Sequence, residues 1–137
     1  MIAVDTNVLV YAYDASEPDK QNRAQEVLRE GFARGDSIST QVLGEFFVTV
    51  TRKIRKPLPV PDAAELLERL ALLPVASIDW PTVQQAVAMQ QRYELSYWDA
   101  LVLATAFRAG CAKVLSEDLN AGQDYDAVVV ENPFDGL

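Results

Sequence analysis

The chain opens with Met1-Ile2-Ala3-Val4-Asp5-Thr6-Asn7, a short apolar run that stops at a carboxylate. A brief apolar segment followed at once by polar residues predicts a buried strand. A second run of the same kind, Lys113-Val114-Leu115-Ser116-Glu117-Asp118, also ends at an aspartate. In open parallel sheets, ligand sites gather outside the carboxyl ends of the strands. Asp5 and Asp118 are therefore candidate site residues on neighbouring strand ends.

Short apolar runs alternate with longer helical ones along the rest of the chain, which predicts an α/β protein with a parallel sheet. Strands are predicted at 2–4, 37–39, 75–78, 114–116 and 128–130. Helices are predicted at 18–33, with Phe32 on the apolar face, at 61–72, 81–93 and 97–108, and from a cap at Thr40 to about 54. A short helix or turn is predicted at 7–13. The proline-rich segment 56–61 is predicted to be a stiff connector, and the tail 132–137 a loose end.

Length and composition predict a single domain covering residues 1–137. No apolar run is long enough for a membrane helix, and no secretory signal is visible. With the single cysteine, Cys111, these features predict a cytoplasmic protein. The net charge of −8 counts against a protein that coats nucleic acid. It is compatible with a small site that meets one phosphate through a metal, and with a basic partner protein.

Two further acids, Glu45 and Asp99, lie near the starts of predicted helices, on the same rim of the sheet as the strand ends. Each acid has an ordinary explanation. Asp5 can cap a helix, Asp99 completes a capping box with Ser96, Glu45 lies on a polar helix stripe, and Asp118 lies in a turn sequence.

Together, however, all four carboxylates can converge on one side of the sheet. A pair of them 4 Å apart would repel by roughly 4 kcal/mol at an effective dielectric of 20. Folding then requires a cation or raised pKa values. The chain contains no histidine, so a hard divalent cation with oxygen ligands is favoured, and a metal-free ribonuclease with a histidine acid–base pair is excluded. Metal-assisted phosphodiester hydrolysis is the leading functional interpretation.

Four segments resemble the motifs of PIN-domain nucleases, in the same order and at similar spacing. They are VDTNVLVY at 4–11, STQVLGEF at 39–46, SYWDALVLA at 96–104 and LSEDL at 115–119. The first and third are the more specific. The resemblance covers nearly the whole chain and is closest to the VapC-type toxins of bacterial toxin–antitoxin pairs.

The resemblance implies a three-layer α/β/α fold with a central, mostly parallel sheet. It also implies Mg²⁺- or Mn²⁺-dependent RNA cleavage, a homodimer, and a cognate antitoxin that blocks the site. By motif position, the metal-binding catalytic acids would be Asp5, Glu45, Asp99 and Asp118. Thr6, Asn7 and Ser116 would be supporting polar groups.

The one basic cluster, formed by Arg52, Lys53, Arg55 and Lys56, is a candidate RNA contact, although cations also suit a helix C-terminus. Tyr97 and Trp98 are expected to be core or dimer contacts. Two alternatives remain open: a housekeeping PIN nuclease without an antitoxin, and a non-catalytic PIN-like binding module. A phosphatase-like or receiver-like domain that accepts phosphate is disfavoured. Such a receiver would be expected to have a lysine near the last strand, and Lys113 comes before that strand instead of after it.

Overall fold

The computed structural model describes residues 1–137. Its main sheet has the strand order β1 (Ile2–Val4), β4 (Lys113–Leu115), β6 (Val128–Glu131) and β5 (Asp124–Tyr125). β1 pairs with β4 and β4 pairs with β6 in parallel, whereas β5 pairs with β6 in antiparallel orientation. The register aligns Val4 with Leu115, so β1 and β4 end side by side.

A second parallel pair, β2 (Ile38–Ser39) and β3 (Val75–Ala76), continues from the free edge of β1. A parallel bridge between Ala3 and Ser37 joins it to the main sheet. In this bridge the Ser37 N–H donates to the Ile2 carbonyl at 2.7 Å and the Val4 N–H to the Ser37 carbonyl at 3.0 Å. The predicted mostly parallel sheet is confirmed, although β5 and its antiparallel pairing were not foreseen.

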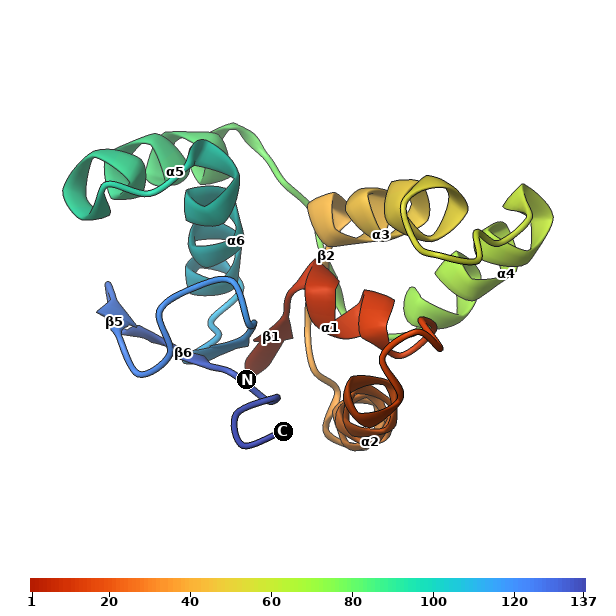
Figure 1. Ribbon diagram of the computed structural model, residues 1–137. Helices are drawn as coiled ribbons and strands as arrows, with labels where there is room; N and C mark the ends of the chain where they lie inside the picture. The colour runs from red at the N-terminus through yellow and green to blue at the C-terminus, as the bar shows by residue number, and fades with distance from the viewer.

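Six helices cover the strands: α1 (Thr6–Tyr11), α2 (Pro18–Arg34), α3 (Thr40–Arg52), α4 (Val60–Leu70), α5 (Trp80–Tyr93) and α6 (Tyr97–Arg108). Figure 1 shows α1 to α4 on one side of β1, and α5 with α6 on the other. None of these helices combines the length and the apolar character needed to cross a bilayer.

The core consists of two hydrophobic clusters separated by the sheet. Val4 and Leu115 belong to the cluster under α1 to α4, whereas Val114 and Val130 belong to the one under α5 and α6. Neighbouring residues on one strand face opposite sides, which explains why Val114 and Leu115 enter different clusters. The arrangement confirms the three-layer α/β/α fold.

The structure corrects three local expectations. The N-cap of α3 is Ser39 and not Thr40, because Ser39 keeps extended backbone angles (φ −116°, ψ 164°) and its hydroxyl accepts from the Val42 N–H. Phe32, expected to face inward on α2, is 43% exposed. The tail is docked, since Phe134 is only 5% exposed and packs edge-on against the Tyr11 ring. Apolar burial of this one aromatic residue outweighs the polar character of its neighbours.

Candidate active site

Asp5 lies immediately after β1 and is nearly buried, at 7% exposure. It is the N-cap of α1, and its Oδ1 accepts from the Thr6 N–H at 2.7 Å. Its Oδ2 accepts from the Ser116 hydroxyl at 2.8 Å. The Asp5 N–H donates to the Leu115 carbonyl at 3.0 Å, which fixes the end of β1 against the end of β4. The helix cap and the candidate site role are therefore carried by one side chain.

Ser116 is fully buried and uses its whole hydrogen-bonding capacity. A serine hydroxyl has one donor and two acceptor positions. The Ser116 hydroxyl donates to Asp5 and accepts from the Asn7 Nδ2 at 3.2 Å and from the Asp118 N–H at 3.1 Å. One buried serine thus joins three of the residues predicted from the motifs.

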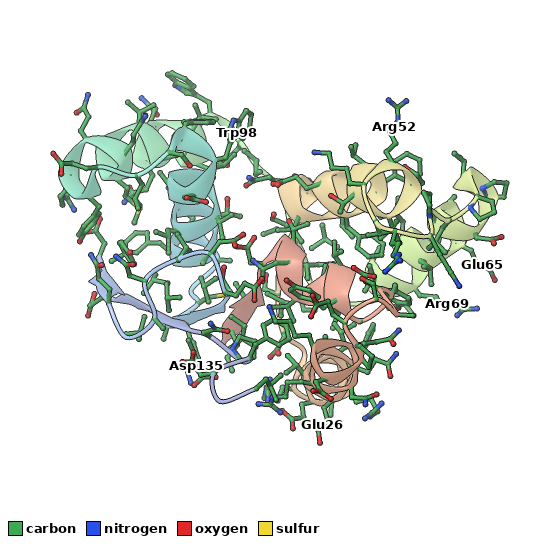
Figure 2. All side chains as sticks on the ribbon, viewed as in Figure 1. Glu26, Arg52, Glu65, Arg69, Trp98 and Asp135 are labelled. Atoms are coloured by element: carbon green, nitrogen blue, oxygen red, sulfur yellow. The ribbon has the colours of Figure 1, made fainter.

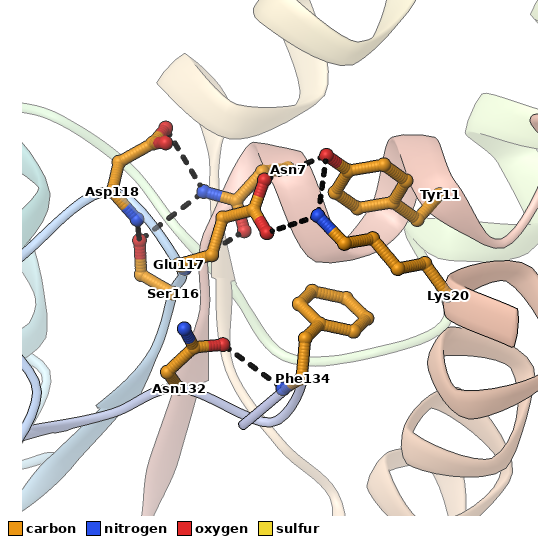
Figure 3. A network of polar contacts seen from close by, with 8 residues as sticks. All are labelled: Asn7, Tyr11, Lys20, Ser116, Glu117, Asp118, Asn132 and Phe134. Atoms are coloured by element: carbon orange, nitrogen blue, oxygen red, sulfur yellow. Dashed lines mark hydrogen bonds and ion pairs between the residues drawn. The ribbon is translucent and has the colours of Figure 1, made fainter. Parts of the chain in front are cut away.

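Asn7 lies between the two strand ends (Figure 3). Its Nδ2 donates to Asp118 Oδ2 at 3.1 Å, and its Oδ1 accepts from the Glu117 N–H at 3.3 Å. The amide group therefore holds both the backbone and the carboxylate of the segment that follows β4. The supporting role of Asn7 in the site stays a prediction, which these contacts favour.

Asp5 has the electrostatic environment expected of a site carboxylate. The pKa of Asp5 is raised to about 6, chiefly by burial and also by the negative charges of Asp118 and Glu45, against the hydrogen bonds from Ser116 and Thr6, which lower it. Glu45 is an exposed residue in the second turn of α3. Glu45, Asp118, Thr6 and Asn7 line one hollow of about 500 Å³. Three of the four predicted acids therefore act on a common region.

Asp99 has a different setting. It lies in the first turn of α6, where its N–H donates to the Ser96 hydroxyl at 3.1 Å, as a helix cap requires. The preceding Trp98 carbonyl accepts from the Gln41 side chain at 3.3 Å, so the first turns of α3 and α6 touch. Asp99 does not line the hollow beside Asp118 and is not among the charges that shift Asp5.

The donor set fits Mg²⁺ or Mn²⁺. No three acidic or cysteine side chains stand close enough to enclose a metal by themselves. Mg²⁺ needs no such cage, because it keeps several waters and uses one or two protein carboxylates. Carboxylate oxygens of Asp5 and Asp118 are hard ligands of the required kind. The buried Thr6 Oγ1 beside them has no hydrogen-bond partner, and an unpaired hydroxyl there suits a hydrated cation.

The motif reasoning missed a set of contacts beside this site (Figure 3). The Tyr11 hydroxyl donates to Glu117 Oε1 at 2.6 Å, and Lys20 Nζ contacts Glu117 Oε2 at 2.9 Å. Lys20 also lies over the Tyr11 ring, 4.7 Å from its centroid. The Lys20–Tyr11–Glu117 set anchors the residue between Ser116 and Asp118. No local signal reveals it, because Lys20 and Glu117 are 97 positions apart.

The basic cluster at the end of α3 divides into two groups. Lys53 and Arg55 line the hollow that contains Asp118, and Arg55 and Lys56 line an adjoining one. Arg52 lines neither, and Figure 2 shows its side chain pointing outward from α3. RNA contact stays a prediction for all four residues, and the lining of the two hollows favours Lys53, Arg55 and Lys56 over Arg52.

Comparison with known proteins agrees with this geometry. The PIN domain family model matches residues 2–123. No curated protein sequence matches the chain. A toxin–antitoxin complex from Klebsiella pneumoniae has a similar structure, with a TM-score of 0.74 and 21% identity over 98% of each chain.

Two other solved structures are similar. VapC20 of Mycobacterium tuberculosis, described as a toxin that cleaves the sarcin–ricin loop, has a TM-score of 0.65 and 20% identity over 86% of this chain and 90% of its own. VapBC2 of Rickettsia felis, bound to a DNA fragment from its promoter, has a TM-score of 0.67 and 16% identity over 96% and 98%. At these identities the likeness concerns the fold.

Proposed function

The chain belongs to the PIN domain family, and on this basis we propose that it is a metal-dependent endoribonuclease and the toxin of a type II toxin–antitoxin pair. One observation carries the proposal. The buried Asp5 lies at the carboxyl end of β1, hydrogen-bonded through Ser116 to the segment that holds Asp118, and the charges of Asp118 and Glu45 act on it. An aspartate that only caps a helix is not expected to have two further carboxylates close by.

In the proposed mechanism, Asp5 and Asp118 would hold the metal, and Glu45 is a further acid of the same hollow. Asp99 joins this set on its motif position, since it lines no part of the hollow in the structure. Mg²⁺ or Mn²⁺, when bound, supplies charge neutralisation at the phosphate and a lower pKa for water. Ser116 and Thr6 fix the two Asp5 oxygens, and Asn7 fixes Asp118. An acid that is not bound to the metal is then free to orient the attacking water or to accept a proton from it.

The partners form part of the proposal. An antitoxin would block the site, and a basic side chain of the antitoxin, such as arginine, suits the carboxylates there. A solved structure of similar fold, from Klebsiella pneumoniae, is a toxin–antitoxin complex. We also propose a homodimer, since Trp80 and Trp98 are 68% and 63% exposed and large exposed apolar side chains favour an interface. A cytoplasmic location follows from an RNA substrate and an intracellular partner.

Cleavage of a labelled RNA by the purified chain tests the enzymatic part. Mg²⁺ or Mn²⁺ should support cleavage, EDTA should stop it, and Asp5→Asn and Asp99→Asn should abolish it. Asp135→Asn is the matched control, because Asp135 is an exposed tail residue (Figure 2). Full activity of both site variants, or activity in EDTA, would contradict the mechanism.

A second experiment tests the toxin role. Expression of the chain alone should arrest bacterial growth, Asp5→Asn should not, and co-expression of the neighbouring small gene product should restore growth. Purified protein that cleaves RNA without arresting growth would favour the housekeeping nuclease instead.

A further inference from the structure

The hollow that contains Asp118 does not end at the carboxylates. It continues into a second hollow of about 550 Å³, and the two share Asp14, Ser16, Ile54 and Arg55. One continuous groove therefore runs from the acidic residues, between the α1–α2 loop and the segment after α3, to Tyr13 and Leu58. A strand bound at the acids has a defined path outward.

The far hollow has an apolar floor and a basic rim. Tyr13, Ile54 and Leu58 are partly buried side chains that pack against the core, and the Tyr13 ring meets Phe46 edge-on at 5.7 Å. Arg55 and Lys56 lie beside this floor, and Asp14 is the only acid there. An apolar floor that includes an aromatic ring, with cations beside it, suits a nucleobase attached to a phosphate.

The segment that carries these cations is held in place. The Leu58 N–H donates to the Val50 carbonyl at 2.8 Å, and the Ile54 N–H to the Thr49 carbonyl at 3.2 Å. Pro57 and Pro59 flank Leu58 and restrict the backbone further. The backbone that carries the floor residues Ile54 and Leu58 is therefore held in place before any ligand arrives.

This groove is unusual in the chain because its basic side chains form no ion pairs. Seven of the twelve basic side chains contact an acid. The five without such a contact are Arg29, Arg52, Lys53, Arg55 and Lys56, and four of these lie within five consecutive positions. In a chain with eight surplus negative charges, an unpaired basic cluster is not explained by a shortage of partners.

The helix dipole accounts for only part of the cluster, because Arg52 lies in the last turn of α3 and Lys53 is its C-cap, whereas Arg55 and Lys56 lie beyond the helix. The effect of the dipole falls off within the last turn, and α3 ends at Arg52. Lys53, Arg55 and Lys56 follow the helix, and three of the four cations face the groove.

We propose that the hollow formed by Tyr13, Ile54, Arg55, Lys56 and Leu58 is a nucleotide subsite. It binds one nucleotide of single-stranded RNA beside the cleaved bond, with the base on the apolar floor and its phosphate at Arg55. Lys53 binds the phosphate between this nucleotide and the acids. The proposal rests on the proposed function for its ligand class.

Binding of a fluorescein-labelled RNA hexanucleotide in EDTA, followed by anisotropy, separates binding from cleavage. Arg55→Gln should raise the Kd about tenfold. It should also flatten the dependence of log Kd on log salt by about 0.7, the loss of one phosphate contact on a single strand. Arg52→Gln, which removes an unpaired cation from the same cluster but outside the groove, should leave both quantities unchanged. Equal effects of the two variants, or no effect of Arg55→Gln, would overturn the subsite.

An abasic scan tests the floor. In the wild-type protein, removing the base at one position next to the cleavage point should weaken RNA binding about tenfold more than removing a base elsewhere. A tenfold change corresponds to the typical contribution of one stacked base. In Tyr13→Leu this positional difference should vanish, with circular dichroism confirming the fold. A uniform scan in the wild type would overturn the base-binding part. A polyglutamate peptide that displaces RNA at equal charge concentration would show a general anion surface and would also overturn it.

The outcomes distinguish this inference from the proposed function. The protein could bind RNA with the predicted effects of the Arg55 and Tyr13 variants and yet fail to cleave it in Mg²⁺. This result would contradict the proposed nuclease activity and support the subsite. The protein could instead cleave RNA in Mg²⁺ while Arg55→Gln and Arg52→Gln bind RNA equally well. This result would support the nuclease activity and contradict the subsite.

Discussion

At the scale of single residues, the site depends on a few polar contacts between the ends of two strands. Ser116 and Asn7 hold Asp5 and Asp118 in fixed positions without neutralising either. Hydrogen bonds lower the pKa of Asp5, but burial and neighbouring charges raise it more. The folded protein therefore carries a destabilising charge at neutral pH, which a bound cation would relieve.

This imbalance predicts the pH dependence of stability. The pKa of Asp5 rises from 3.8 to about 6 on folding, so the folded state takes up a proton between these values. The penalty is absent below pH 4, grows as the pH rises, and is complete above pH 6, at about 2–3 kcal/mol. Asp5→Asn should therefore raise the free energy of unfolding at pH 8 in EDTA and leave it nearly unchanged at pH 4. Urea denaturation at the two pH values measures the difference, and an equal effect at both would show that Asp5 does not titrate there.

At the scale of secondary structure elements, α3 carries Glu45, and the stability of this helix depends on the hydrogen bond at its N-cap. The Ser39 hydroxyl accepts from the Val42 N–H at 3.1 Å, whereas Thr40 is exposed. Ser39→Ala should lower the free energy of unfolding by about 1 kcal/mol, and Thr40→Ala should change it much less. Thermal unfolding of the two variants provides the comparison. A larger loss of stability in Thr40→Ala than in Ser39→Ala would show that Thr40 is the N-cap, as predicted from the sequence.

Two glycines inside helices provide a second test at this scale. A Cβ on Gly31 of α2 would lie 2.9 Å from Asp36 Oδ2, and Asp36 is buried and held by Arg34. A Cβ on Gly44 of α3 would meet nothing within 4 Å. Gly31→Ala should therefore destabilise by about 1–3 kcal/mol. Gly44→Ala should stabilise by about 0.5–1 kcal/mol through helix propensity. Stabilisation by both variants would mean that Asp36 moves aside without cost.

Several features could be predicted from the sequence because local patterns determine them. Asp5 and Asp118 follow apolar runs, and this alone places them at strand ends. The choice between Ser39 and Thr40 depends on backbone angles that two adjacent hydroxyl residues do not specify. The Lys20–Glu117 contact and the docking of Phe134 depend on tertiary structure and leave no periodic signal. The carboxylates were predicted to converge by topology, but the setting of Asp99 depends on how α6 packs.

At the scale of the whole molecule, the tail packs against residues beside the site. Phe134 packs against Tyr11, and Lys20 lies 5.8 Å from the Phe134 ring centroid (Figure 3). The Arg23 side chain donates to the Pro133 carbonyl at 2.9 Å. The tail therefore supports the residues that anchor Glu117.

Phe134→Ala should lower the free energy of unfolding by about 3–5 kcal/mol, because it empties a buried aromatic position. Leu137→Ala, in the same tail but 63% exposed, should change it by less than about 0.5 kcal/mol. Chemical denaturation measures both. Equal stability of the two variants would show that the tail contributes little to the core.

The unequal ion pairing has a kinetic consequence. Most positive charges are cancelled by adjacent acids, so a polyanion that diffuses toward the molecule meets repulsion from nearly every direction. Four of the five unpaired cations lie within residues 52–56, so attraction is strongest along the edge that Lys53, Arg55 and Lys56 form. The electric field thus orients an approaching strand before contact, and added salt slows encounters at this edge while it quickens those elsewhere.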